Sequence, residues 1–235
     1  MRIEAYVFDI DDTLIATTKA NRRARRRCLD FFLQSAGLEA NEAVIESERR
    51  LYDVFGWSKP DDLWRSLAIE LDADKPAQQW LEEATELFTS AFFESLSTLP
   101  TVTHTLGALR ERGVQIAIIS DGEKQLQQRK LRETGLDNLF ESERVLVSIQ
   151  SDYYNAKPST TNFRRMEKAL GLLPHELLYV GDKPWDITAA NAAGWTSVRT
   201  LQAGGDGANN WPFPPLKIQT PDNEISTFSE LLDIK

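Results

Sequence analysis

Cysteine and histidine are scarce in this sequence of 235 residues, which holds one cysteine, Cys28, and two histidines. A single cysteine cannot form a disulfide within the chain, and proteins without disulfides are typical of reducing compartments. Cys28 has apolar neighbours on an expected helix, which indicates a packed, inert thiol. The histidines, His104 and His175, fall in no motif. We therefore expect a cytoplasmic protein whose chemistry depends on neither residue type.

Long apolar runs and an excess of positive charge are also missing. No window approaches the roughly 18 uninterrupted apolar residues of a membrane-spanning helix. The opening Met1-Arg2-Ile3-Glu4 has no basic stretch followed by an apolar core, so we expect a soluble protein without an export signal. Lys and Arg total 27 against 36 Asp and Glu, a formal charge of −9. That charge disfavours nucleic acid and anionic membranes as partners and favours a small molecule.

The apolar residues that are present, 41% of the chain, are enough for one core, or for one core and a smaller appended domain. Five short apolar segments are predicted to be buried strands: Ile3–Phe8, Val114–Ile119, Val145–Val147, Leu177–Val180 and Thr196–Arg199. Helical patterns separate the later strands, which implies right-handed crossovers and a parallel sheet covered on both faces. Gln202–Pro221 is expected to be a surface loop and Ile225–Leu232 a closing helix.

A long helical region interrupts this alternation after the first strand. From about Lys19 to Leu96 the periodicity is helical and is broken by segments that contain glycine, which predicts four helices. The sequence thus predicts an α/β fold with a doubly wound, Rossmann-like parallel sheet. Residues 1–15 and 99–235 would form this core, and residues 16–98 an inserted all-helical cap.

Polar residues follow the predicted strands, at the edge where ligands gather in an open parallel sheet. They are, in chain order, Asp9 and Asp11, then Ser120, Asp121 and Gly122, then Lys157, then Asp182 and Asp186. This set of carboxylates, one hydroxyl and one ammonium suits phosphoryl transfer. Each element alone is often a chance match or a turn, but four of them in order at expected strand ends favour one shared site.

Each group has a use in such a reaction. Asp9 and Asp182 are hard oxygen ligands that can share Mg²⁺, and the metal with Lys157 would neutralise the phosphoryl oxygens. Ser120 and nearby backbone amides would hydrogen-bond the same oxygens. Asp9 is a competent nucleophile toward phosphorus. Asp11, two residues further along the strand, would protonate the leaving oxygen and then activate water.

The segment Asp9-Ile10-Asp11-Asp12-Thr13-Leu14 resembles the first motif of the haloacid dehalogenase-like hydrolase superfamily, and the other three superfamily motifs follow in order. The resemblance spans the chain and points to the phosphatase branch with a helical cap inserted after the first motif. It implies a phospho-aspartate intermediate on Asp9 and proton transfer by Asp11, with Thr13 steadying the loop. Phosphate would be bound by Ser120, Asp121, Gly122 and Lys157, and Mg²⁺ by Asp9, Asp11 (through its carbonyl), Asp182 and Asp186.

Two positions depart from the superfamily pattern. Asp12 stands where many members have glycine. Lys183 replaces the usual small polar residue after Asp182, and the spacing from there to Asp186 is short. Asp11 favours phosphate as the reacting group, because the dehalogenases of the superfamily lack this second aspartate. The Asp-Asp-Thr-Leu-Ile opening, the Ser-Asp-Gly motif and the cap length are similar to archaeal-type sugar and triose phosphate phosphatases.

The predicted cap offers candidates for substrate specificity. Tyr52 and Trp57 belong to an aromatic group near a helix break, and they either form cap core or contact substrate. A run of arginines is expected to form a solvated helix face. Arg25 is the exception, because it projects toward the apolar side and is expected to meet a substrate anion or a carboxylate in the cap.

The sequence therefore predicts Mg²⁺-dependent hydrolysis of a small phosphomonoester: a sugar, triose or nucleotide monophosphate. Two alternatives stay open. A sugar phosphomutase shares the four motifs, but it needs extra proton-handling groups, and the predicted cap has no clear His or Lys cluster. A receiver-like signalling module also combines Asp, Ser or Thr, Lys and Mg²⁺ without catalysis, but it carries its acceptor on an internal strand and has no cap.

Overall fold

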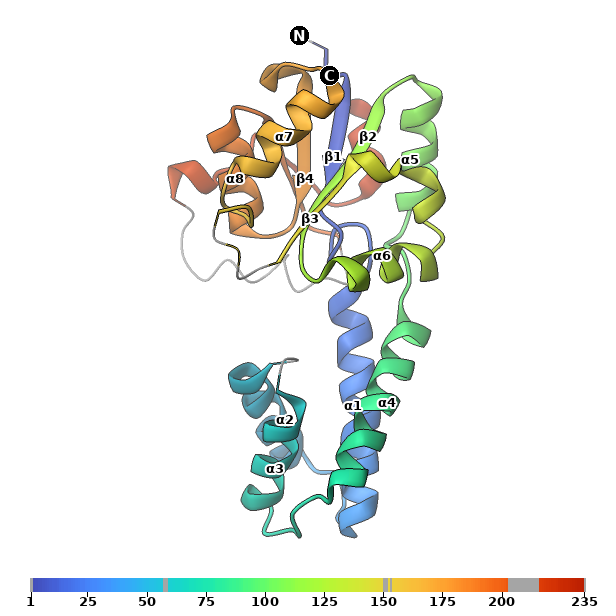
Figure 1. Cartoon of the computed structure of the whole chain (residues 1–235), viewed down its shortest axis with the longest axis vertical. Helices are drawn as coiled ribbons and strands as arrows, with labels where there is room; N and C mark the ends of the chain where they lie inside the picture. The colour runs from blue at the N-terminus through green and yellow to red at the C-terminus, as the bar shows by residue number, and fades with distance from the viewer. Residues whose placement is uncertain (1, 57–58, 150–151, 153, 203–215, 235) are drawn as a thin grey trace. The chain divides into compact units, whose positions relative to one another are not determined.

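The computed structural model describes residues 2–56, 59–149, 152, 154–202 and 216–234 (Figure 1). The chain forms two compact units. We call Met1–Lys19 together with Leu96–Lys235 the core unit, and Ala20–Ser95 the helical unit. None of the described helices has the length and apolar character needed to cross a membrane.

The core unit is built on a parallel sheet, which confirms the predicted α/β fold class. Six strands lie in the order β3-β2-β1-β4-β5-β6, and every neighbouring pair is parallel. The strands are β1 (Ala5–Phe8), β2 (Gln115–Asp121), β3 (Val145–Ser148), β4 (Leu177–Gly181), β5 (Thr196–Thr200) and β6 (Asn223–Ile225).

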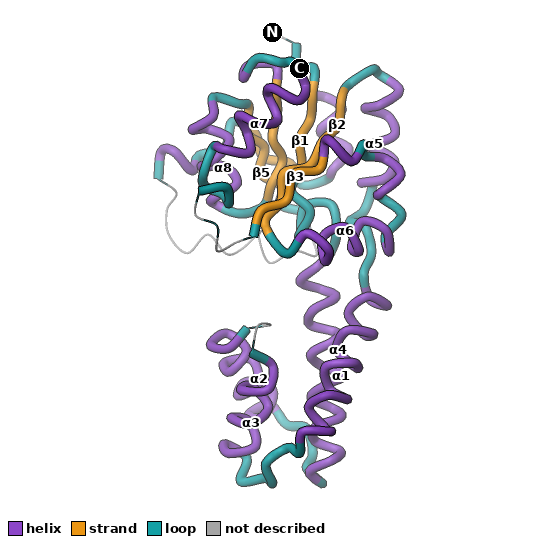
Figure 2. Tube along the Cα trace, in the orientation of Figure 1, coloured by secondary structure: helices purple, strands orange, loops and turns teal. Residues whose placement is uncertain are grey.

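Helices cover both faces of the sheet, which is why its central strands are apolar on both sides (Figure 2). On β1, Tyr6 and Phe8 point into one apolar cluster, while Ala5 and Val7 point into the other. The first cluster is closed by α5 (Val102–Glu111), α6 (Lys124–Glu133) and the 3-10 helix η6 (Phe228–Asp233). The second is closed by α7 (Thr161–Leu170) and α8 (Pro184–Ala193).

The strand order reverses at β1. From β1 the chain continues to β2 and β3 on one side, and then returns to place β4 on the other side. In such a sheet the loops on either side of the reversal diverge, and they leave a crevice beyond the carboxyl ends of the two strands. The loops that follow β1 and β4 therefore face a common space.

The helical unit contains the predicted four helices: α1 (Thr17–Ala36, whose first turn belongs to the core unit), α2 (Glu42–Phe55), α3 (Pro60–Glu70) and α4 (Gln78–Ser95). Aromatic rings form much of its interior. Phe32, Trp64 and Trp80 pack with ring centroids 5.6 to 5.9 Å apart. Outside this interior, Arg22, Arg23, Arg26 and Arg27 are exposed, as expected for a solvated helix face.

The end of the chain differs from the prediction. The expected closing helix over Ile225–Leu232 is confirmed only in part, because Phe228–Asp233 forms the 3-10 helix η6 while Asn223–Ile225 forms strand β6 at the sheet edge. Phe228 and Leu231 are buried on η6, three residues apart, so their spacing suits a 3-10 turn as well as an α-helix. Most of the expected loop Gln202–Pro221, residues 203–215, lies outside the described residues.

Candidate active site

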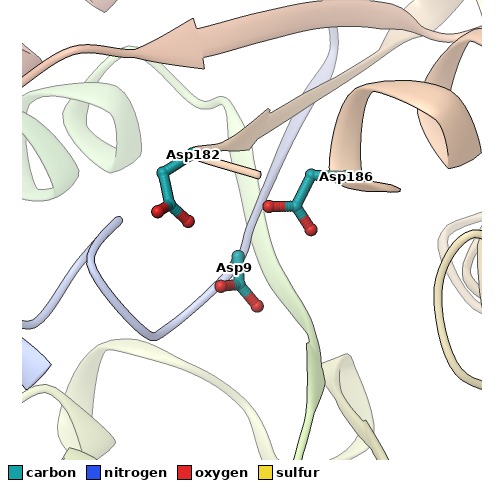
Figure 3. Close-up of side chains that lie close together, drawn as sticks. All are labelled: Asp9, Asp182 and Asp186. Atoms are coloured by element: carbon teal, nitrogen blue, oxygen red, sulfur yellow. The ribbon is translucent and has the colours of Figure 1, made fainter. Parts of the chain in front are cut away.

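Three carboxylates meet at the carboxyl end of the sheet. Asp9 follows β1, Asp182 follows β4, and Asp186 lies in the first turn of α8. All three are buried, and an oxygen of each lies within 4.8 Å of the others (Figure 3). Gly181 allows α8 to come this close, because a Cβ at Gly181 would lie 2.5 Å from the Cβ of Asp186.

A buried ammonium holds two of these carboxylates. Lys157 Nζ donates to Asp9 Oδ1 at 2.8 Å and lies 2.6 Å from Asp186 Oδ1. It also donates to the hydroxyl of Tyr179 at 3.1 Å. Burial alone would lower the pKa of Lys157, but the charges of Asp186 and Asp9 outweigh it and raise that pKa well above its ordinary value. Lys157 is therefore a fixed positive charge beside the expected nucleophile.

The carboxylates carry more negative charge than Lys157 balances. Burial, followed by the charges of Asp186 and Asp11, raises the pKa of Asp9 to about 7 although Lys157 opposes the shift. Burial and the charge of Asp186 raise the pKa of Asp182 to about 8. Raised values of this kind mean that the ionised forms repel one another in a poorly solvated space.

A divalent cation fits this cluster. Hard carboxylate oxygens are the ligands that Mg²⁺ prefers, and a cation among them would relieve the repulsion that raises the pKa of Asp9 and Asp182. Asp186 is placed differently from the other two. Its Oδ1 faces Lys157 and its Oδ2 accepts from the backbone N–H of Lys183 at 3.0 Å, so both oxygens already have partners.

Asp11 lies outside this trio, and its carboxylate is hydrogen-bonded by side chains of α6 and of the first turn of α1. Its Oδ1 accepts from Lys130 Nζ at 2.6 Å and from the hydroxyl of Thr17 at 2.5 Å. Its Oδ2 accepts from Gln127 Nε2 at 2.8 Å. Burial would raise the pKa of Asp11, but the Lys130 charge and these hydrogen bonds outweigh burial and lower it. The structure therefore holds Asp11 as an ionised carboxylate.

The end of β2 supplies the predicted phosphate-binding residues. Ser120 is fully buried, and its Oγ accepts from Gln127 Nε2 at 3.2 Å. Asp121 Oδ2 accepts from the backbone N–H of Lys157 at 3.0 Å, which ties this strand end to the lysine loop. Gly122 donates its own N–H to Ser148 O at 2.7 Å, so only its neighbours' amides are candidates for phosphate. A Cβ at Gly122, where φ is 149°, would lie 2.9 Å from Gln127 Nε2.

A cavity of about 520 Å³ opens at this end of the sheet. It is lined by Asp9, Asp11, Asp121, Ala156, Lys157, Pro158, Asp182, Lys183 and Trp185. Trp185 is 41% exposed and contributes a large aromatic side chain to that lining. The lining of the cavity thus combines charged side chains with the apolar surface of Ala156, Pro158 and Trp185. Such a lining suits a phosphate attached to a small organic group.

The turn after Asp9 explains one departure from the superfamily pattern. Asp12 has a φ of 57°, a left-handed conformation in which glycine is favoured and in which Asp is tolerated. Its carboxylate accepts from the N–H and the hydroxyl of Thr18, at 2.9 and 2.5 Å. Thr13 is fully buried in the same turn, and its N–H donates to Ile10 O at 3.4 Å. Asp12 therefore ties the turn to the start of α1 and does not point at the trio of carboxylates.

Comparison with known proteins agrees with this arrangement. The family model of haloacid dehalogenase-like hydrolases matches residues 3–194. The chain belongs to this family. A glyceraldehyde 3-phosphate phosphatase of Methanopyrus kandleri is 31% identical over 99% of this chain and 97% of the relative. A ribulose-1,5-bisphosphate 5-phosphatase of Halopiger xanaduensis is 27% identical over 98% of this chain and 98% of the relative.

These two relatives match nearly the whole length of this haloacid dehalogenase-like hydrolase, which places it in the phosphatase branch of the family. The fold agrees with that placement. A haloacid dehalogenase family hydrolase of Deinococcus radiodurans, solved with bound phosphate and sodium, superposes with a TM-score of 0.68 over 97% of this chain and 93% of its own. Their sequences are 23% identical, so this likeness concerns the fold.

The sequence did not point to three residues that the structure brings to the hydrolase site. They are Gln127 and Lys130 of α6, which hold Asp11, and Tyr179 of β4, which contacts Lys157. Gln127 and Lys130 lie three positions apart and are buried beside Leu131 on the same helix. The signal that could have identified Gln127 and Lys130 is their position on the apolar face of the helix. That signal is weak, because lysine is rarely buried.

The structure bears differently on the three cap residues that were predicted to contribute to substrate specificity: Arg25, Tyr52 and Trp57. Arg25 meets a cap carboxylate, the second of its two expected partners: its Nε and Nη2 donate to Glu48 at 2.8 and 2.6 Å. The guanidinium also lies 3.7 Å from the ring centroid of Tyr52. Trp57 lies outside the described residues. Contact of Arg25 or Tyr52 with substrate stays a prediction.

Proposed function

We propose that this hydrolase cleaves a small phosphomonoester in two steps, through a phospho-aspartate on Asp9 and with Mg²⁺ as cofactor. The observation that carries the proposal is the buried contact between Lys157 and Asp9 inside a trio of carboxylates. It pairs an acidic nucleophile with a fixed positive charge at the point where an anionic phosphoryl group would enter. The helical unit is then the cap of the enzyme.

In the first step, Asp9 attacks phosphorus and the bond from phosphorus to the leaving oxygen breaks. Lys157 neutralises charge on the phosphoryl oxygens, and the hydroxyl of Ser120 donates to them. Asp11 acts in this step in its protonated form, which the negative charge of a phosphate bound beside it favours over the ionised form of the empty site. It gives that proton to the leaving oxygen, which departs as an alcohol. The products are the phospho-aspartate on Asp9 and the dephosphorylated metabolite.

In the second step, water attacks the phosphorus and the bond to Asp9 breaks, which regenerates the Asp9 carboxylate and releases inorganic phosphate. Asp11 accepts the proton of the attacking water. The ionised state in which the structure holds Asp11 is the form that this step requires.

Mg²⁺ would be held by Asp9 and Asp182 with the backbone carbonyl of Asp11, and Asp186 would support that set. The metal would supply positive charge to the phosphoryl oxygens when bound. Since both oxygens of Asp186 are engaged by Lys157 and by the N–H of Lys183, we assign Asp186 an indirect role, in which it fixes Lys157 beside Asp9.

The relatives suggest the substrate class. Glyceraldehyde 3-phosphate and ribulose 1,5-bisphosphate, the substrates named for the two relatives, are both small sugar phosphates. A triose or sugar phosphate also fits a cavity lined by charged side chains and by Trp185. We therefore place triose and sugar phosphates first among the expected substrates, before nucleotide monophosphates.

Phosphate release from a panel tests this proposal. The panel holds glyceraldehyde 3-phosphate, ribulose 1,5-bisphosphate, phosphoglycolate, a hexose phosphate and a nucleotide monophosphate, each with Mg²⁺. We expect release from at least one compound, and loss of release in Asp9→Asn and in EDTA. Full activity in either condition contradicts the mechanism. Conversion to an isomeric phosphate without free phosphate would indicate a mutase, and a phospho-aspartate stable for minutes would indicate a signalling module.

A further inference from the structure

We propose that Lys130 and Gln127, two residues of α6, position the Asp11 carboxylate so that its Oδ2 accepts the proton of the attacking water in the second step. This inference rests on the proposed function. Lys130 and Gln127 act through Asp11, so they are positioning residues and have no contact of their own with substrate in this assignment.

The burial of Lys130 is the first observation. Lys130 is 4% exposed, although a lysine on a surface helix ordinarily keeps its ammonium in water. Burying an ammonium is unfavourable unless a charged partner compensates for the lost solvation. Asp11 is such a partner, at 2.6 Å from Lys130 Nζ. An apolar side chain would fill the same space without this cost, so packing alone does not account for a lysine here.

Gln127 supplies the second observation. Its Nε2 lies 2.8 Å from Asp11 Oδ2, 3.2 Å from Ser120 Oγ and 3.0 Å from the backbone carbonyl of Asp121. One amide group thus touches both the proton-transfer carboxylate and the phosphate-binding hydroxyl. The absence of a side chain at Gly122 leaves the room that this amide occupies. Gln127 therefore sets the spacing between Asp11 and Ser120.

The hydrogen bonds also distinguish the two oxygens of Asp11. A carboxylate has about four lone-pair sites, two on each oxygen. Lys130 and Thr17 take both sites on Oδ1, whereas Gln127 takes one site on Oδ2. Oδ2 is left as the oxygen that can accept a further proton. In the second step the water oxygen bonds to phosphorus, the bond from phosphorus to Asp9 breaks, and the water proton passes to this oxygen.

Stopped-flow kinetics with p-nitrophenyl phosphate and Mg²⁺ separates the two steps, because p-nitrophenolate leaves without needing a proton. For Lys130→Met we expect a burst close to one nitrophenolate per enzyme, followed by a steady-state rate lowered about 10- to 100-fold. Phospho-aspartate should accumulate and be visible by intact-protein mass spectrometry. Lys130→Arg, which keeps the charge, should restore most of the steady-state rate.

Two further variants sharpen the result. Gln127→Leu should show the same burst together with a raised KM, because Ser120 also loses a partner. Lys124→Met removes an exposed lysine from the same helix and should leave both phases unchanged. Equal loss of burst and steady state in Lys130→Met, or no loss of either, overturns the inference.

The proposed function has its own control in this experiment. Asp11→Asn should accumulate phospho-aspartate and Asp9→Asn should not. If Asp11→Asn forms no phospho-aspartate, the two-step mechanism itself is wrong. If Asp11→Asn shows the burst and Lys130→Met does not, only the roles of Lys130 and Gln127 are wrong.

Discussion

At the scale of single residues, Lys157 is held by a hydroxyl as well as by carboxylates. The hydroxyl of the fully buried Tyr179 accepts from Lys157 at 3.1 Å and donates to the Ile119 carbonyl at 2.7 Å. We expect Tyr179→Phe to lower the free energy of unfolding by about 1–3 kcal/mol, because two buried groups lose a partner. We expect kcat to fall about tenfold, because the ammonium beside Asp9 is held less firmly.

Urea unfolding and phosphate release measure these two effects. Tyr154→Phe is the matched control, since Tyr154 is 86% exposed and lies in the same core unit. A similar loss in both variants would contradict the specific role of the Tyr179 hydroxyl.

The carboxylates of the site also give the metal-free protein a particular pH dependence. In the folded protein the pKa of Asp9 is raised to about 7 and that of Asp182 to about 8, chiefly by burial. In the unfolded chain the pKa of an aspartate side chain is about 4. Between these limits the folded state binds more protons than the unfolded state, so its stability falls as pH rises. In EDTA we therefore expect a lower free energy of unfolding at pH 9 than at pH 6.

Added Mg²⁺ should raise that stability more at pH 9 than at pH 6, because protons compete with the cation for the same oxygens. Urea unfolding with EDTA or with Mg²⁺ at both pH values measures this difference. In Asp182→Asn the dependence on pH should shrink, because one of the two shifted groups is gone. Stability in EDTA that rises from pH 6 to pH 9 would be incompatible with this account.

At the scale of elements, the junction between β4 and α8 depends on the absence of a side chain at Gly181. A Cβ there would lie 2.5 Å from the Asp186 Cβ, so Gly181→Ala must push the first turn of α8 away from the strand end. We expect loss of at least about 1–3 kcal/mol of stability from overpacking and a large loss of kcat, because Asp186 moves relative to Lys157. Thermal unfolding and phosphate release measure both.

Gly107→Ala is the control for that substitution. Gly107 lies within α5, and a Cβ there would meet nothing within 4 Å apart from its chain neighbours and the backbone of its own helix. Alanine is the better helix former by about 0.5–1 kcal/mol, so this variant should be at least as stable as the parent chain. Equal losses in the two variants would show that Gly181 has no special place in the site.

The elements also show what the sequence could and could not predict. β1 and β4 are short apolar segments that end at aspartates, so both the strand and the position of Asp9 or Asp182 follow from local pattern. β6 has three residues, too few for a pattern, and it forms because β5 offers an edge to pair with. Lys130 was missed for a related reason, since its burial depends on Asp11, a residue 119 positions away.

At the scale of the whole molecule, the two units have different interiors and different chemistry. The core unit carries the trio Asp9, Asp182 and Asp186 together with Lys157, and Mg²⁺ would bind there. The helical unit is held by its own aromatic cluster and by the ion pair of Arg25 with Glu48. Proteins with more than one unit often depart from two-state unfolding. We therefore expect Mg²⁺ to stabilise the core unit and to leave the helical unit nearly unaffected.

Cys28 can report on the helical unit alone. Its side chain is fully buried, Sγ donates to the Ala84 carbonyl at 3.5 Å, and burial with the charge of Glu48 raises its pKa to about 12. Because the thiolate is the reactive form, the native protein should resist alkylation at pH 8 and react once the helical unit opens. The urea midpoint of Cys28 labelling should stay the same with and without Mg²⁺. In the double variant Cys28→Ser, Ala117→Cys, which moves the thiol to a buried position of the core unit, the labelling midpoint should rise with Mg²⁺. If both midpoints rise together, the two units unfold as one.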